Sequence, residues 1–330
     1  MRLIALARLA VAVSKAGGIG FLAAGTDVGD LKGELHRAAK LLERSPNNGA
    51  DPELMPLGVG FINWGLDLET ALAALKEHLP AAVWFFAPKR DGDLRTWTNG
   101  IRKLSQGRTK IWIQVGTVKD ALFAAQTCRP DVLVVQGADA GGHGLAKGAG
   151  IVSLLPEIAD ALHNEGQGHI ALVAAGGIVE GRGAAASLTL GASGVVLGTR
   201  FLASEEANIA RGYQNDVLST SDGGISTVRT SVYDELRGTT GWPVAYNGRG
   251  IINRSFVDAQ NGMPVYENKE LYKKALKKGD AGWGEDGRLT AYAGTGIGLV
   301  KRIQSAQEIV EEVRQGVIKI LSEPPKRSKL

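Results

Sequence analysis

Cysteine and clustered histidine are the scarcest features of this 330-residue chain. Cys128 is the single cysteine, so an intrachain disulfide and a cysteine-rich metal site are both excluded, which fits a reducing compartment. Cys128 follows a helix-like stretch and precedes Pro130, so we interpret it as a passive thiol. Four of the five histidines lack the spacing of metal ligands, and we assign no metal site and no role to them: His36, His78, His163 and His169.

Net charge and long apolar runs are also scarce. A formal charge of +4 is small for this length and the basic residues are scattered, so the sequence gives no nucleic-acid footprint. No stretch reaches the ~18 to 20 consecutive apolar residues that a bilayer span needs. The N-terminal run LIALARLAVAV resembles a short signal peptide, but Arg8 and Lys15 interrupt it. We therefore interpret it as the first helix and expect no membrane association.

Glycine is abundant, and many glycines stand at the ends of apolar runs. The chain has 45 glycines, about twice the usual ~7% share. Seven strand-like runs alternate with helix-like segments, which argues for βαβ units and a parallel sheet. The runs cover residues 18–22, 56–61, 81–86, 110–115, 132–136, 170–175 and 194–198, and the helix-like segments include 30–44, 66–78 and 119–127.

The segment QGADAGGHG at 136–144 follows the apolar run VLVV. Its glycines allow the backbone to approach a ligand more closely than a Cβ would permit. No helix or strand pattern explains His143, whose unperturbed pKa near ~6.5 suits proton transfer. A surface-loop histidine is the alternative interpretation of this segment taken alone.

Two later segments repeat the same order of apolar run, small residues and helix start. One strand runs into Gly176 and Gly177, and the next runs into Gly198 and Thr199. Free backbone N–H groups at such turns favour an anion, and (β/α)8 barrels bind phosphate with the loops after their last two strands. Tight turns without a ligand are the alternative for either segment alone, but two in succession behind a histidine loop favour a phosphate site.

The motifs QGADAGGHG, AAGGI and VLGTRF, in this order, resemble the nitronate monooxygenase family, formerly called 2-nitropropane dioxygenases. AVSKAGGIGFLAAG at 12–25 and LGVGFINWG at 57–65 extend the resemblance over the first two thirds, and RGIINRSF and YAGTGIGLV extend it more loosely. The resemblance implies an FMN-dependent (β/α)8 TIM barrel that oxidises alkyl nitronates, or nitroalkanes, with O2 to a carbonyl compound and nitrite. In YAGTGIG, Thr295 stands where the family more often has glutamine, which is a departure from the family pattern.

The resemblance also assigns expected roles to residues of this chain. His143 is expected to act as the base toward a neutral nitroalkane or to hold the nitro group. The residues expected to bind FMN are Gln114, Gln136, Gly141, Gly142, Gly176, Gly177, Gly198 and Thr199. Two alternatives remain: a related FMN-dependent enoyl-thioester reductase, and a non-catalytic barrel with impaired flavin binding.

The N-terminus departs from the family pattern. There, a first strand ending in Pro-Met precedes the AVSKAGG helix, whereas this chain starts with that helix. We expect a barrel whose first strand is missing or altered, because it opens differently or because the gene start is lost or misassigned. Either case puts full flavin affinity in doubt.

The expected organisation has four parts. Residues 1–204 form the barrel core, residues 205–290 a loosely patterned insertion that caps the barrel mouth, residues 291–322 the returning C-terminal helix (roughly 298–321), and residues 323–330 an extended tail. Glycines break the 205–290 segment, and neither Trp242 nor Tyr246 there belongs to a motif that we can match.

The tail carries a targeting signal. Ser328, Lys329 and Leu330 form the tripeptide that peroxisomal import receptors bind. We therefore expect a peroxisomal enzyme with that receptor as a partner, and a cytoplasmic one if the signal is not used.

Overall fold

Seven of the apolar runs form the parallel strands of one curled sheet. The computed structural model describes residues 1–43, 54–90, 92–284 and 286–322. The sheet has the order β1-β2-β3-β4-β5-β7-β8 and every neighbouring pair is parallel, so the predicted α/β barrel is confirmed. The strands are β1 Phe21–Gly25, β2 Leu54–Ile62, β3 Leu79–Phe86, β4 Lys110–Val115, β5 Val132–Gln136, β7 Ala171–Ala175 and β8 Gly194–Val196.

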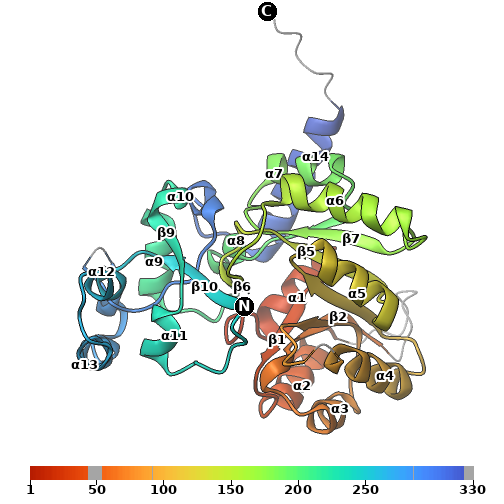
Figure 1. Ribbon diagram of the computed structural model, residues 1–330, viewed down its shortest axis with the longest axis horizontal. Helices are drawn as coiled ribbons and strands as arrows, with labels where there is room; N and C mark the ends of the chain where they lie inside the picture. Colours follow the sequence, from red (N-terminus) through yellow and green to blue (C-terminus); the bar gives the residue numbers. More distant parts are fainter. Residues whose placement is uncertain (44–53, 91, 285, 323–330) are drawn as a thin grey trace, which may run out of the picture.

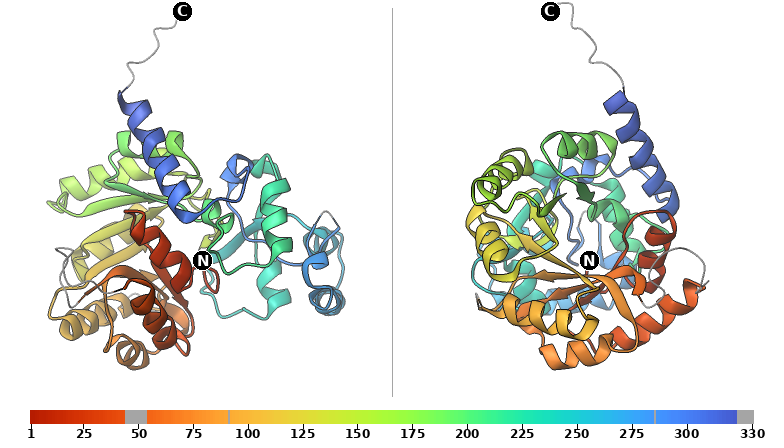
Figure 2. Two further views of the ribbon diagram at one scale, coloured as in Figure 1. Left: turned by 180° about the vertical axis from the view of Figure 1, so that it is seen from behind. Right: turned by 90° about the vertical axis from the view of Figure 1, so that its right-hand side faces the viewer.

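Helices follow the strands and surround the sheet, as the right-hand view of Figure 2 shows. Side-chain caps start two of them: Asp67 accepts from the Thr70 N–H at 2.8 Å, and Thr117 accepts from the Asp120 N–H at 3.0 Å. The barrel helices are α1 Ala7–Lys15, α2 Leu31–Leu41, α3 Leu68–Leu75, α4 Asp93–Ser105, α5 Val118–Cys128, α6 Ile151–Asn164, α7 Gly181–Thr189, α8 Thr199–Leu202 and α14 Ala306–Ser322.

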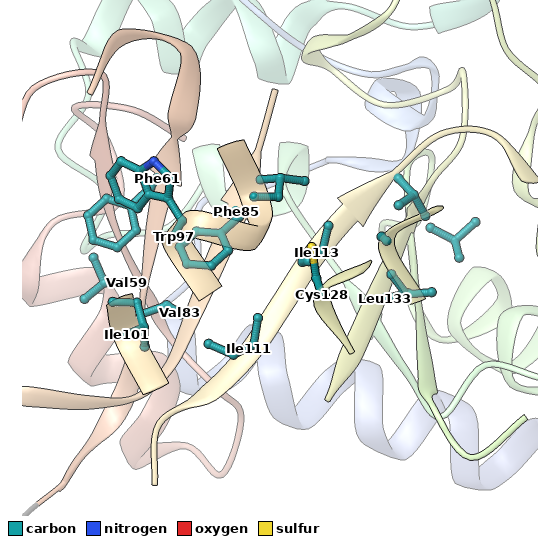
Figure 3. Packing of buried hydrophobic residues seen from close by; sticks show 14 of the residues in the cluster. Val59, Phe61, Val83, Phe85, Trp97, Ile101, Ile111, Ile113, Cys128 and Leu133 are labelled. Atoms are coloured by element: carbon teal, nitrogen blue, oxygen red, sulfur yellow. The ribbon is translucent and has the colours of Figure 1, made fainter. Parts of the chain in front are cut away.

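Alternate residues of the strands pack outward against these helices. Figure 3 shows this layer beside Trp97 and Ile101 of α4 and Cys128 of α5. The strand residues in it are almost fully buried: Val59, Phe61, Val83, Phe85, Ile111, Ile113 and Leu133. Burying such side chains stabilises a fold by roughly 1.5 to 3 kcal/mol each, so this layer is a main source of barrel stability. Cys128 lies within it, consistent with a passive thiol.

Three aromatic rings cluster on β1, β3 and β4. The Phe21 centroid lies 5.3 Å from that of Trp84 and 5.1 Å from that of Trp112. Gly58 of β2 makes room for Phe21, because a Cβ at position 58 would lie 2.2 Å from the Phe21 ring. Close packing of these rings therefore requires glycine at position 58.

β1 and β8 are the two edges of the sheet in the described part of the chain. The segment before α1 contacts the β1 edge, because the Ala5 carbonyl accepts from the Ala23 N–H at 2.9 Å. The adjacent Ile4 carbonyl accepts from the N–H of Asn208, beyond β8, at 3.1 Å. In the described chain α1 precedes β1 directly, and a short irregular segment lies beside the β1 edge.

Residues 205–290 form a smaller lobe next to the barrel (Figure 1). The sequence of this segment is loosely patterned, and in the structure it contains short helices and strands. Its glycines serve close packing: a Cβ on Gly212 would lie 2.4 Å from the Asp280 carbonyl oxygen. The elements are α9 Arg211–Ser219, α10 Gly223–Ser226, β9 Thr227–Thr230, α11 Val232–Arg237, β10 Tyr246–Ile251, α12 Arg254–Gln260, α13 Val265–Leu276 and the 3-10 turn η2 Gly279–Gly282.

A second, antiparallel sheet joins this lobe to the barrel. It has the order β6-β10-β9, and β6 (Gly142–Leu145) belongs to the loop that follows β5. Arg229 of β9 donates to the Ala140 carbonyl at 3.0 Å, and Arg249 of β10 donates to the Ala138 carbonyl at 3.2 Å. Burial, with the neighbouring Arg249, lowers the pKa of Arg229 to about 10. Two guanidinium groups therefore hold the loop after β5.

The chain then returns to the barrel through a non-helical segment. The 3-10 helix η3 covers Thr295–Leu299, and α14 begins at Ala306, eight residues later than the sequence predicted. The predicted extended tail, 323–330, with the expected signal Ser328–Leu330, lies outside the described residues. None of the described helices combines the length and the apolar composition that crossing a bilayer requires.

Candidate active site

A cavity of about 900 Å³ lies at the carboxyl ends of the barrel strands. The last residues of six strands line it: Gly25, Ile62, Phe86, Gln136, Ala175 and Val196. In α/β barrels this is the end at which ligands bind. Trp242 of the smaller lobe and Tyr292, just after it in the chain, line the opposite side.

Every residue that the sequence analysis proposed for the site lines this cavity. They are Gln114, Gln136, Gly141, Gly142, His143, Gly176, Gly177, Gly198 and Thr199. The structure thus brings together residues from the ends of four strands, and their individual roles stay predictions.

Gly176, Gly177, Gly198 and Thr199 form what we call the glycine cradle, after β7 and β8. Gly176 and Gly177 have φ values of +108° and +74°, which side-chain-bearing residues rarely adopt. Over Gly198 a Cβ would meet no atom within 4 Å, so its space belongs to the cavity. Within the described chain, the backbone N–H groups of Gly177, Gly198 and Thr199 have no acceptor. Unpaired donors with room above them suit a phosphate group.

The segment around Thr295 ties the cradle to the loop after β5. The Gly294 N–H donates to Thr199 Oγ1, and the Thr295 N–H donates to the Asp139 carbonyl, each at 3.0 Å. Thr295 Oγ1 also donates to the Asp139 carboxylate at 3.0 Å. Thr295 does not line the cavity, and its two hydrogen bonds to Asp139 hold the loop after β5.

His143 lies on a strand, which corrects the sequence interpretation that no sheet pattern explains it. It is the second residue of β6 and pairs with Gly248 of β10. The pattern was hidden because β6 has only four residues, two of them glycine, and its partner lies about a hundred residues further along the chain. A Cβ on Gly248 would lie 2.6 Å from the Tyr292 ring, so glycine there lets Tyr292 approach the sheet.

Asp234, from α11, is the main polar partner of His143. Its two carboxylate oxygens lie 3.0 and 2.9 Å from His143 Nε2. Thr239 Oγ1 donates to the same carboxylate at 2.7 Å and the Tyr292 hydroxyl donates at 3.3 Å. Burial, and next the charge of Asp234, raises the pKa of Tyr292, which therefore stays a neutral donor.

Sequence reasoning missed Asp234 altogether. It is 91 residues from His143 and falls in the first turn of a six-residue helix. Acidic residues are common there because they interact favourably with the helix dipole. No local signal distinguishes it.

Aromatic rings form the wall around His143. Trp242 stacks on the imidazole with 3.7 Å between centroids and 6° between planes. Trp242 also lies 5.5 Å from Trp64 and 5.9 Å from Phe86, measured between ring centroids. Burial raises the pKa of Tyr246, whose ring centroid lies 5.4 Å from that of Phe86, to about 12. The space beside His143 is therefore largely apolar.

The two glutamines at strand ends are partly engaged by protein groups. Gln114 Oε1 accepts from the Trp84 indole N–H at 3.2 Å, and Gln136 Nε2 donates to the His143 carbonyl at 3.3 Å. Each retains one amide group for a ligand.

The remaining histidines lie away from the cavity. His36 and His78 contact each other at 3.3 Å between Nδ1 and Nε2. In the described part of the chain, no group of three or more His, Cys, Asp or Glu residues is placed to hold a metal ion.

Comparisons with known proteins agree with one another. A family model described as nitronate monooxygenase matches residues 95–316, more than half of the chain. The nitronate monooxygenase npaC of Metarhizium robertsii is 51% identical over 326 residues, covering 98% of this chain and 90% of that protein. The nitronate monooxygenase of Neurospora crassa is 41% identical, covering 96% of this chain and 86% of that protein.

Two solved structures share the fold at 23% identity. A nitroalkane oxidase from Streptomyces ansochromogenes gives a TM-score of 0.74, covering 97% of this chain and 94% of that one. FabK from Thermotoga maritima gives 0.71, with 97% and 91% covered. At this identity, both comparisons speak for the fold alone.

Proposed function

This chain belongs to the nitronate monooxygenase family of oxidoreductase enzymes, and from that premise we propose that it oxidises alkyl nitronates with O2 to a carbonyl compound and nitrite, with FMN as cofactor. The observation that carries the proposal is that the glycine cradle and His143 line the same cavity. A small nitronate fits the apolar space between the barrel mouth and the rings around His143.

The residues present fit FMN. The cradle offers unpaired N–H groups and open space at Gly198 for the phosphate. Gln136 and Gln114 stand at the ends of β5 and β4, where their free amide groups would bind the isoalloxazine ring or the ribityl chain. Gly141 and Gly142 carry no side chains that would fill the space beside the loop after β5. Gly142 has a φ of +68°, and a Cβ added to it would meet no atom within 4 Å. The bound flavin would supply the electron transfer that starts oxidation of the nitronate.

His143 would serve the substrate in one of two ways. As a base, the imidazole removes the α-proton of a neutral nitroalkane and leaves the nitronate in place. As an imidazolium, it holds the anionic nitro group of a preformed nitronate. Its side chain is 13% exposed and Trp242 covers one face, so bulk water is largely excluded from the proton-transfer step.

The two alternatives from the sequence are not favoured. An enoyl-thioester reductase would share the fold, but FabK is only 23% identical, against 51% and 41% for the two nitronate monooxygenases. A non-catalytic barrel with impaired flavin binding would have no need for the cradle, which is intact beside the open edge of the sheet. Turnover of a nitronate without added nicotinamide would discriminate against the reductase.

The first experiment is the visible absorption spectrum of the purified protein, followed by identification of the chromophore that denaturation releases. We expect a flavin spectrum and FMN at about one per chain. A protein that stays colourless after incubation with FMN would overturn the cofactor assignment and favour the non-catalytic alternative.

A substitution tests the role of His143. We expect His143→Asn to lower the turnover of neutral nitroalkanes roughly 100-fold or more, a loss typical of a missing general base. Turnover of preformed nitronates should fall far less, because these have already lost the proton. Steady-state rates with both substrate forms measure the difference, and equal losses on both would reject the base assignment.

We also propose that the tripeptide Ser328-Lys329-Leu330 directs the enzyme to peroxisomes. A fluorescent protein fused in front of the full chain should then colocalise with a peroxisomal marker in eukaryotic cells. A cytoplasmic distribution, unchanged when the tripeptide is deleted, would count against it.

A further inference from the structure

The carboxylate of Asp234 is buried and holds three hydrogen-bond donors. The side chain is only 7% exposed, and its partners are His143 Nε2, Thr239 Oγ1 and the Tyr292 hydroxyl. A carboxylate taken out of water is costly unless such donors surround it. The donors come from three segments, so the Asp234 charge is fixed at one point beside the cavity.

This arrangement determines which imidazole nitrogen carries the proton. An ionised carboxylate only accepts hydrogen bonds, so His143 Nε2 must be the donor. A neutral imidazole has one N–H, which leaves the lone pair on Nδ1. Nδ1 has no hydrogen-bond partner among the described residues and is not counted among their buried unpaired atoms.

We propose that Asp234 is the positioning residue of the reaction: it fixes His143 in the Nε2–H tautomer and so makes Nδ1 the atom that accepts the substrate proton. In that step the α-C–H bond breaks and the proton moves to Nδ1. The C–H electron pair forms the C=N bond of the nitronate, while the N=O π pair moves onto a nitro oxygen, which takes the negative charge. The resulting imidazolium lies 2.9 Å from a fixed negative charge, which stabilises it. This inference rests on the proposed function, since it assigns an atom and a partner to the proposed base.

The geometry of α11 supports this role. Asp234 is anchored by the residue before it, because the Tyr233 side chain is fully buried and its hydroxyl donates to the Ile251 carbonyl of β10 at 2.5 Å. β10 in turn pairs with β6, which carries His143. Asp234 on α11 and His143 on β6 are therefore both held in place through β10.

The first test needs no turnover, and it uses a variant only to assign the His143 signals. The protein is labelled with ¹⁵N-histidine, and the His143 ring signals are identified by their loss in His143→Asn. At alkaline pH we expect a protonated Nε2 and an unprotonated Nδ1. A protonated Nδ1, or a rapid mixture of both tautomers, would overturn the proposal even if the enzyme oxidises nitronates.

The second test compares Asp234→Asn with Glu235→Gln. Asparagine keeps the shape but can donate as well as accept, so the tautomer is no longer fixed. We expect kcat/KM for a neutral nitroalkane to fall roughly 10²- to 10⁴-fold, with nitronate turnover changed less than about threefold. Glu235 is the matched control, because it does not line the cavity and, among the described residues, its carboxylate accepts a hydrogen bond from Ser231, the residue just before α11.

The outcomes separate this proposal from the function. Loss on the neutral substrate alone, with a scrambled tautomer and unchanged flavin absorbance, supports Asp234. Equal losses on both substrates reject the positioning role. If Asp234→Asn does not fold, the tautomer of His143 measured in the unaltered protein still supports or rejects the proposal. Absence of turnover in the unaltered protein contradicts the proposed function and leaves the tautomer result standing.

Discussion

The two sides of the cavity are built from different parts of the chain and from different chemistry. On the barrel side, the glycine cradle presents backbone N–H groups and almost no side chain. On the side of the smaller lobe, His143, Asp234, Trp242 and Tyr292 form what we call the histidine side, which presents side chains that bind one another. The barrel side offers the donors that we propose for the FMN phosphate, whereas the histidine side carries the groups that we propose for proton transfer.

This difference also concerns distance along the sequence. The cradle comes from two consecutive turns within residues 176–199, so its geometry follows from local chain direction. The histidine side joins residues 91 positions apart, so it forms only when the second sheet is complete. Substitutions on the two sides should therefore affect binding and chemistry separately.

The largest effect should come from a carboxylate in the cradle. Gly198→Asp places a charge in space that no protein atom fills, at a residue without a positive φ, so the fold should tolerate it. We expect the Kd for FMN to rise roughly 100-fold or more, about 3 kcal/mol, because the carboxylate displaces the phosphate and repels it. Fluorescence titration of the flavin-free protein with FMN measures this change.

Gly33→Asp is the matched control. Gly33 lies on α2, away from the cavity, and a Cβ there would also meet no atom within 4 Å. Its FMN affinity should equal that of the unaltered protein. Unchanged affinity in Gly198→Asp would mean that the phosphate binds elsewhere and that the cradle is only a pair of tight turns.

The same contrast explains how much of the molecule the sequence predicts. All seven barrel strands are predicted to within a few residues, because each is a local apolar run whose neighbours in the sheet are its neighbours in sequence. The cradle is predicted too, since a glycine pair and a Gly-Thr step are local signals. The backbone side of the site can therefore be predicted from short local segments of the sequence.

The smaller lobe and the histidine side are largely unpredicted. Gly212 and Gly248 resemble breaks in a pattern, but each lies where a distant residue packs against the backbone: Asp280 on Gly212, and Tyr292 on Gly248. No local sequence signal distinguishes Asp234. Its contact with His143 depends on the pairing of β6 with β10. Long-range packing, which one sequence does not reveal, decides this half of the site.

A smaller effect is expected on the histidine side from Trp242→Leu. The stacked pair of Trp242 and His143 contributes about 0.5 to 1.5 kcal/mol beyond the area that it buries. We expect turnover of a neutral nitroalkane to fall about 2- to 10-fold with FMN affinity unchanged, because the ring orients His143 and touches no cradle residue. Steady-state kinetics and FMN titration on the same preparation separate the two quantities.

Trp283→Leu is its control, because Trp283 lines the same cavity but stacks on Tyr213, with 6.2 Å between centroids. If Trp242→Leu weakened FMN binding as much as it slowed turnover, the two sides would not be independent and the contrast between them would fail.

The smallest effect should come from Thr295, which belongs to the segment between the two sides. Thr295→Val keeps the shape and removes the hydrogen bond to Asp139, leaving that carboxylate with one donor fewer. We expect a loss of about 1 kcal/mol in the free energy of unfolding, seen as a melting temperature lower by about 1 to 2 °C for a chain of this length. Thr127→Val is the control, since Thr127 makes a comparable bond to the Phe123 carbonyl on an exposed helix surface and should melt nearly as the unaltered protein does.

Kinetics of Thr295→Val then place this segment on one side or the other. Thr295 binds the loop after β5 and Gly294 binds Thr199, so the segment should support the cradle, and the Kd for FMN should rise a few-fold while kcat at saturating FMN stays constant. A lower kcat with unchanged FMN affinity would show instead that the segment acts through Tyr292 and Asp234. In that case the segment would belong to the histidine side, although it is bonded to Thr199 of the cradle. The two halves of the site would then not be independent, because a change at the loop after β5 would reach the proton-accepting imidazole.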